Sequence, residues 1–273
     1  MKTISLALAA VLSVSATMAD AQAVKPLKKV MELIMPEGGG ANGAAVAWHP
    51  VQQKYYAAMA GNATYTLGVF SAAGKLLSPE DQITFFDIRG LWYNPAKKTL
   101  QMNGYNENGW AEYKLVAKGF PDTVTTLYTG MLQPSEQSTG AFNPKENIVY
   151  FLNDDGKLDK YSMKDGIYLD VIELHPGKAK LVNASQEEDH DEIDLLENYN
   201  KSTVIFTGTT GTEIGLLNHA ENQIELYNIK TGLLTKKFSF PADAPVPQFL
   251  NFSYTNGIYW LFDKEARTWK GYK

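Results

Sequence analysis

The sequence predicts an all-β protein, a five-bladed β-propeller of four-stranded blades that is closed by an N-terminal strand. Three observations predict this fold. A short motif recurs five times, at intervals of 45, 49, 64 and 48 residues. Short β runs separated by turns fill each interval, and the last unit has only three such runs. Repeats of this length with four strands each are typical of propeller blades.

The recurring motif is an aromatic residue, then His or Asn, then Pro, with a glycine 22 or 24 residues after the proline. It occurs at Trp48-His49-Pro50 with Gly74, at Tyr93-Asn94-Pro95 with Gly119, and at Phe142-Asn143-Pro144 with Gly166. The fourth copy lacks the proline but keeps a 24-residue gap, from Gly208 to Gly232, and the fifth begins at Phe252. His49 takes the position of Asn in its sister copies, so we expect it to cap the same turn.

Each unit contains runs rich in β-branched and aromatic residues that end at turn residues, which is the pattern of short strands. The expected strands are 43–48, 54–60 and 65–71 with an irregular fourth; 90–93, 99–104, 110–116 and 123–128; 139–142, 148–152, 158–163 and 168–174; 203–207, 213–217, 223–229 and 234–240; and 249–254, 258–262 and 268–272. Residues 30–35 form an apolar run ahead of the first unit. We expect them to supply the missing strand of the last blade, because closing the ring protects its edge strands.

The third interval, of 64 residues, is too long for one blade and too short for two. We therefore expect an insertion, residues 175–200, between blades three and four. A six-bladed ring is the alternative.

Residues 1–23 have the features of a secretory signal peptide: Lys2, an apolar run over 4–14, and small residues before the expected cleavage site at Ala23. The expected mature chain, 24–273, is a single propeller domain that is secreted or periplasmic. No later stretch approaches the 18 apolar residues of a membrane span. The chain has no cysteine, which excludes disulfides, thiolate metal sites and cysteine nucleophiles.

The charge balance argues against polyanionic partners. The net charge is −5, from 25 basic and 30 acidic residues, and only Arg89 and Arg267 are arginines. Nothing in this composition attracts nucleic acid or an anionic membrane surface. We expect a monomer whose partner is a small molecule, a glycan or another protein.

The strand–aromatic–Asn–Pro–turn–strand–Gly unit resembles the repeats of the YVTN/NHL-like β-propeller superfamily. The resemblance covers most of residues 30–273 and implies the propeller fold. It implies no single activity, because that superfamily includes ligand binders, scaffolds and enzymes such as lactonases.

The insertion contains a possible metal site. Six carboxylates and one imidazole lie within eight residues, around Asp189, Asp191 and Glu192, and Ca²⁺ takes six to eight oxygen ligands. No other cofactor is expected. The spacing does not match an EF-hand loop, and a solvated acidic loop is the alternative.

Polar residues at the starts of the inner strands form a second candidate site, for ligand binding. They are Asn42, Asp87, Arg89, Glu136, Ser138 and Gln248. Asp87 and Arg89 project from the same side of a strand, so a structural ion pair is the alternative to a ligand-binding arginine. Tyr105, Trp110 and Trp269 could stack on sugars, although core packing is the default for each.

The sequence favours an exported binding or scaffold protein, because no complete catalytic set appears. The alternative is a carbohydrate-active hydrolase or lyase that uses Asp87 and Glu136, since glycoside hydrolysis needs two carboxylates flanking one bond. A metal-dependent, lactonase-like enzyme would need three or four ligands on the central axis, and the sequence places none there.

Overall fold

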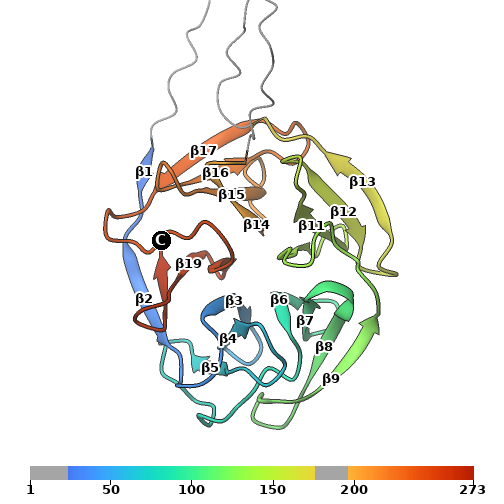
Figure 1. Ribbon diagram of the computed structural model, residues 1–273, viewed down its shortest axis with the longest axis vertical. Coiled ribbons are helices and arrows are strands. Elements are labelled where there is room, and N and C mark those ends of the chain that lie inside the picture. The colour runs from blue at the N-terminus through green and yellow to red at the C-terminus, as the bar shows by residue number, and fades with distance from the viewer. Residues whose placement is uncertain (1–23, 176–195) are drawn as a thin grey trace, which may run out of the picture.

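The computed structural model describes residues 24–175 and 196–273, which form five β-sheets arranged as blades around a central axis (Figure 1). The innermost strands of blades 1 to 5 are β3 (Asn42–His49), β6 (Ile88–Asn94), β10 (Ala141–Asn143), β14 (Tyr199–Phe206) and β18 (Phe252–Thr255). The five-bladed propeller is therefore confirmed, and the described chain forms five blades rather than six.

Each inner strand begins a meander that leads outward. Blade 1 continues with β4 (Lys54–Ala60) and β5 (Leu67–Ser71), and blade 2 with β7 (Thr99–Gly104), β8 (Trp110–Leu115) and β9 (Pro121–Tyr128). Blade 3 continues with β11 (Ile148–Leu152), β12 (Leu158–Ser162) and β13 (Tyr168–Ile172), and blade 4 with β15 (Ile214–Asn218), β16 (Gln223–Tyr227) and β17 (Leu234–Ser239). Blade 5 continues with β19 (Ile258–Asp263) and β20 (Thr268–Tyr272). The single 3₁₀ turn of the described chain, η1 (Asn106–Asn108), joins β7 to β8, and no described helix is long and apolar enough to span a membrane.

The N-terminal strand β2 (Lys29–Ile34) closes the ring as the outer strand of blade 5. It pairs antiparallel with β20, with Leu33 opposite Trp269. The backbones of Lys28 and Lys273 exchange two hydrogen bonds, of 3.0 and 2.9 Å, so β2 and β20 meet beside the C-terminus (Figure 1). The closing strand expected from the sequence is confirmed.

Three details differ from the expected strands. Blade 1 has three strands, and its irregular outer part makes only isolated bridges, such as Phe70–Leu76. Strand β14 begins at Tyr199, four residues before the expected start, with a register shift between Tyr199 and Val204. The two-residue strand β1 (Lys25–Pro26) adds a parallel fifth strand to blade 4 through β17.

The recurring His or Asn caps the turn that follows the inner strands of blades 1 to 3, as expected. Asn94 accepts a hydrogen bond from the backbone N–H of Ala96 at 3.0 Å, and Asn143 caps its own turn in the same way. His49 accepts one from the N–H of Gln52 through Nδ1 at 3.3 Å. The imidazole thus replaces the amide oxygen of the sister repeats, and His49 has a structural role.

The recurring glycine is needed for both its backbone conformation and its lack of a side chain. Gly74 and Gly232 have φ values of +80° and +67°, which L-residues with side chains rarely adopt. A Cβ on Gly74 would lie 2.7 Å from the carbonyl oxygen of Glu32 on the closing strand, and one on Gly232 would collide with the carbonyl of Glu173 in blade 3. In these two repeats the glycine therefore lets its blade pack against the preceding one.

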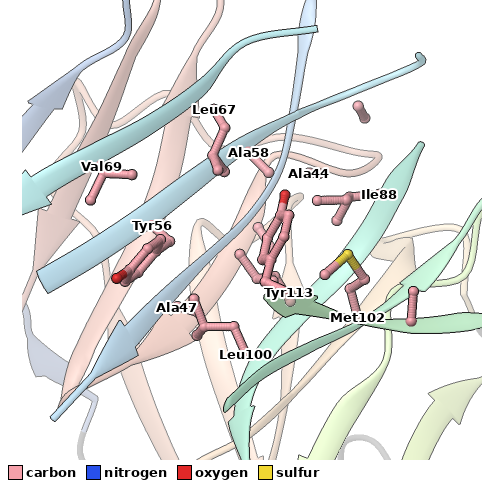
Figure 2. Close-up of a cluster of buried hydrophobic side chains, with 14 of the residues drawn as sticks. Ala44, Ala47, Tyr56, Ala58, Leu67, Val69, Ile88, Leu100, Met102 and Tyr113 are labelled. Atoms are coloured by element: carbon pink, nitrogen blue, oxygen red, sulfur yellow. The ribbon is translucent and has the colours of Figure 1, made fainter. Parts of the chain in front are cut away.

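The hydrophobic core is divided into clusters that lie between neighbouring blades. Figure 2 shows the cluster between blades 1 and 2, in which small residues of β3, such as Ala44 and Ala47, face larger ones such as Met102 and Tyr113. The cluster between blades 5 and 1 contains Leu33 of the closing strand. Successive residues of a strand point to opposite faces of the blade. Because a neighbouring blade covers each face, most blades bury the residues that point to either side.

Candidate functional site

All six ligand-binding candidates lie at the face where the inner strands begin, which we call the start face. Asn42 is the first residue of β3, and Asp87 and Arg89 lie at the beginning of β6. Glu136 and Ser138 precede β10, and Gln248 precedes β18. The propeller topology therefore brings residues far apart in the sequence to one surface.

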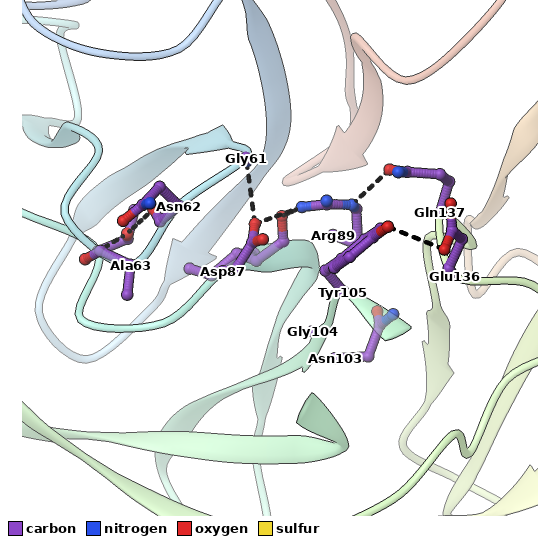
Figure 3. Close-up of polar contacts among 12 residues, drawn as sticks. Gly61, Asn62, Ala63, Asp87, Arg89, Asn103, Gly104, Tyr105, Glu136 and Gln137 are labelled. Carbon is purple, nitrogen blue, oxygen red and sulfur yellow. Dashed lines mark hydrogen bonds and ion pairs between the residues drawn. The ribbon is translucent and has the colours of Figure 1, made fainter. Parts of the chain in front are cut away.

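Arg89 is the centre of a polar network at this face (Figure 3). Its guanidinium donates to Asp87 Oδ1 at 2.5 Å, to the Ile88 carbonyl at 2.9 Å and to Gln137 Oε1 at 2.7 Å. Its side chain is only 4% exposed. Asp87 Oδ1 also accepts the backbone N–H of Gly61 at 2.9 Å, so the network joins blades 1, 2 and 3. Asp87 and Arg89 therefore form a structural ion pair, and their hydrogen bonds to Gly61 and Gln137 extend it across two blade boundaries.

Tyr105 covers this arginine and connects it to Glu136. The guanidinium carbon lies 4.7 Å from the centre of the Tyr105 ring, within the range of a cation–π contact. The Tyr105 hydroxyl donates to Glu136 Oε2 at 2.8 Å, and this bond to the carboxylate raises the pKa of the tyrosine. Glu136 itself is exposed.

The other three candidates lie apart from this network. The Asn42 side chain accepts a hydrogen bond from Asn251 at 3.1 Å, which joins blades 1 and 5. Ser138 is 1% exposed, and its hydroxyl accepts the backbone N–H of Ser135 at 3.1 Å, so it stabilises a loop. Gln248 is exposed. Among the six candidates, Glu136 and Gln248 are exposed, Asn42 and Asp87 are half-buried, and Arg89 and Ser138 are buried.

The central axis offers a narrow, uncharged cavity. It has a volume of about 70 Å³ and is lined by residues of all five inner strands, including Ala45, Trp92, Thr139, Thr203 and Tyr254. No ionisable group other than Tyr254 is among its described lining residues, and burial raises the pKa of that tyrosine. The cavity therefore holds no general acid or base that works near neutral pH.

Trp110 and Trp269, considered above as sugar-stacking residues, are fully buried and belong to the core. Asp189, Asp191 and Glu192, the predicted metal ligands, lie outside the described residues. Within the described ranges, no group of three or more His, Asp or Glu side chains could hold a metal ion.

One buried charge in blade 4 has no counterpart in the sequence predictions. Glu225 is 1% exposed, and its carboxylate accepts hydrogen bonds of 2.7 Å each from the Tyr199 hydroxyl, the Tyr227 hydroxyl and the ammonium of Lys237. Burial alone would raise the pKa of Glu225, but these donors outweigh it and hold the pKa below its usual value. All its partners are protein groups, so the cluster is a structural tie between β14, β16 and β17.

Gln137 and Tyr105, which complete the Arg89 network, were not predicted as its partners. Gln137 stands beside two predicted site residues, Glu136 and Ser138, and this proximity is the only signal in the sequence that could have indicated it.

No family model matches the sequence, and no curated protein matches it. Among solved structures, a glutaminyl cyclase from Myxococcus xanthus superposes with a TM-score of 0.55 at 10% identity, covering 91% of this chain and 96% of that one. An auxiliary nutrient binding protein from Bacteroides thetaiotaomicron gives a TM-score of 0.46 at 13% identity, covering 86% of this chain and 60% of that one. A nidogen/laminin complex gives 0.38 at 11% identity, with coverages of 72% and 63%. At these identities the first similarity shows the fold alone, and the other two TM-scores are too low to carry an argument.

Proposed function

We propose that this protein is an exported β-propeller that binds a small molecule, a glycan or a protein partner without transforming it. The observation that carries this proposal is that both candidate catalytic acids are already hydrogen-bonded to protein groups. Asp87 is bound by Arg89 and by a backbone N–H, and Glu136 is bound by Tyr105. A glycoside hydrolase needs two carboxyl groups free to flank one bond. The start face therefore favours binding over hydrolysis.

The central cavity supports the same proposal. Its volume of about 70 Å³ is well below the roughly 300–1,000 Å³ of typical small-molecule sites. A ligand at this face would contact the rim, where Glu136 and Gln248 are exposed. Loops carried on a rigid scaffold are the usual place for such contacts.

The proposal includes two features that come from the sequence. Export directed by residues 1–23 would be checked by fractionating cells and sequencing the N-terminus of the mature protein, which is expected at Val24. Kinship with the YVTN/NHL-like superfamily is supported by the repeat motif. The Ca²⁺ site at Asp189, Asp191 and Glu192 remains a prediction.

The experiment is a thermal-shift series on the purified protein with Ca²⁺, Mg²⁺, EDTA, neutral oligosaccharides and small organic acids, with a glycosidase assay beside it. A ligand that binds the native state increases the free energy of unfolding and so raises the melting temperature. At a ligand concentration of a hundred times the dissociation constant, the free energy of unfolding rises by about 2.7 kcal/mol. Stabilisation by a compound that is recovered unchanged is the expected result. Turnover of a glycoside that is lost in both Asp87→Asn and Glu136→Gln would overturn the proposal.

A further inference from the structure

A groove lies between blades 4 and 5 at the face opposite the candidate site, where the inner strands end. Its volume is about 210 Å³. The lining comes from the turn after β14, from β17, from the β18–β19 hairpin and from the end of β20; it includes Thr209, Lys236, Phe238, Tyr254, Tyr259 and Lys273. Residues of β16, β17, β18 and β19, together with Lys273 just after β20, therefore build this groove.

Two lysines line the groove in a protein of net charge −5. The described lining contains no aspartate or glutamate, and its one carboxylate is the main-chain group of Lys273 at the C-terminus. Neither Lys236 nor Lys273 forms an ion pair with any described residue. Glu213, the acid in the turn after β14, is not among the lining residues, and its carboxylate accepts backbone N–H groups of Gly211 and Ile229 at 2.8 and 3.2 Å. Unpaired cations beside a concave surface attract an anion.

Aromatic rings form the apolar part of the groove. The rings of Tyr254 and Tyr259 lie 4.8 Å apart, and Phe238 lies 5.8 Å from Tyr259. The Lys236 ammonium lies 4.6 Å from the centre of the Phe238 ring, which holds this charge at the groove wall. Tyr254 and Phe238 are half-buried, so part of each ring faces the groove.

The hydroxyl of Tyr259 is available to a ligand. The residue as a whole is 7% exposed, but its hydroxyl is not among the fully buried polar atoms, and it makes no hydrogen bond to any residue of 24–175 or 196–273. Since Tyr259 lines the groove, a bound molecule could supply the partner.

We propose that this groove binds an acidic saccharide, a sugar that carries a carboxylate. Lys236 and Lys273 would hold the carboxylate, the Tyr254 ring would pack on the apolar face of the sugar, and the Tyr259 hydroxyl would bond to a sugar oxygen. A volume of about 210 Å³ is smaller than the roughly 300–1,000 Å³ of enclosed sites, so one ring enters and the rest of the saccharide lies outside. This site lies on the opposite face from Glu136 and Gln248, and it stands whether or not those residues bind a ligand.

The test is calorimetric titration of the purified protein with an oligogalacturonide, with its uncharged methyl ester and with polyglutamate. We expect the acid to bind and the ester to bind at least about tenfold more weakly, because a charge-assisted hydrogen bond is lost. Binding of the acid should weaken as salt rises.

Two sets of variants locate the site. The double substitution Lys236→Gln with Lys273→Gln should lower the affinity at least about tenfold, and Tyr259→Phe should lower it severalfold with the ring retained. The matched control, Lys97→Gln with Lys145→Gln, removes two exposed lysines from turns on the same face of blades 2 and 3, and should bind as wild type. Melting temperatures confirm that each variant is folded.

Three results would overturn the proposal. The first is that the oligogalacturonide does not bind. The second is that polyglutamate binds equally well, which would make an acidic peptide the occupant. The third is that the groove variants and the control variant lose the same amount of affinity.

Discussion

The closing strand gives the sharpest test of the fold, through two neighbouring residues that lie on opposite faces of β2. Leu33 is fully buried in the cluster between blades 5 and 1, which also contains Phe70, Trp260 and Trp269, whereas Ile34 is 65% exposed. Leu33→Ala and Ile34→Ala each remove three carbon atoms from the same strand. Only the first removes them from the core.

The magnitude follows from this burial. Three buried carbon groups at about 0.8 kcal/mol each give about 2.4 kcal/mol of lost transfer free energy. The cavity left among the aromatic rings adds to this, and measured losses for buried Leu→Ala substitutions are about 2–5 kcal/mol. Ile34→Ala should change the free energy of unfolding by no more than about 0.5 kcal/mol.

Guanidinium unfolding followed by tryptophan fluorescence measures both variants, because Trp260 and Trp269 lie in the affected cluster. In a thermal scan, each kcal/mol corresponds to about 2–4 °C for a domain of this size. Equal effects of the two substitutions would refute the account of ring closure. Deleting residues 24–36 should destabilise the domain more than either, and a melting temperature within a few degrees of wild type would refute it as well.

Three further predictions concern the repeat glycine and the two buried charges. Gly232→Ala should destabilise the fold more than Gly211→Ala in chemical unfolding, because both glycines have positive φ but only the first faces a backbone carbonyl across a blade boundary. Glu225→Gln should cost about 1–3 kcal/mol at pH 7, because it removes the counter-charge of Lys237, which is 26% exposed, and weakens the hydrogen bonds at this buried position. Since the pKa of Glu225 is lowered by folding, its stabilisation is present above the unfolded pKa of about 4.3 and is lost as pH falls through the folded pKa, so the difference in stability between variant and wild type in unfolding experiments should narrow progressively as the pH falls below about 4.3. Arg89→Met should lower the melting temperature by several degrees, because Asp87 loses its cation; an unchanged melting temperature would contradict the structural role of Arg89.

Much of the fold could be predicted because propeller blades are local meanders. Turn residues mark the ends of each strand, and His49, Asn94 and Asn143 cap equivalent turns that could be recognised by spacing alone. The closing strand followed from the incomplete last unit. Strand β1 could not be predicted, because two residues carry no periodicity.

The site was harder to predict, because its contacts cross blade boundaries. The Asp87–Arg89 pair was expected from its spacing along one strand, but Tyr105 and Gln137 reach Arg89 only after the blades assemble. Glu225 alternates with apolar residues in β16, a pattern that normally places the polar set in solvent. Here both faces of the blade are covered, so the same alternation places a carboxylate in the interior.

The backbone pairing of Lys28 with Lys273 has a consequence for how the chain acquires its fold. Strand β2 lies early in the chain and its partner β20 lies far later, so the two can pair only after β20 has been synthesised. Until then β2 has no neighbour in its sheet, and the nascent protein is an open arc with two exposed edges. Complete folding of blade 5 therefore requires β20, and a chain truncated before this strand remains an unclosed arc.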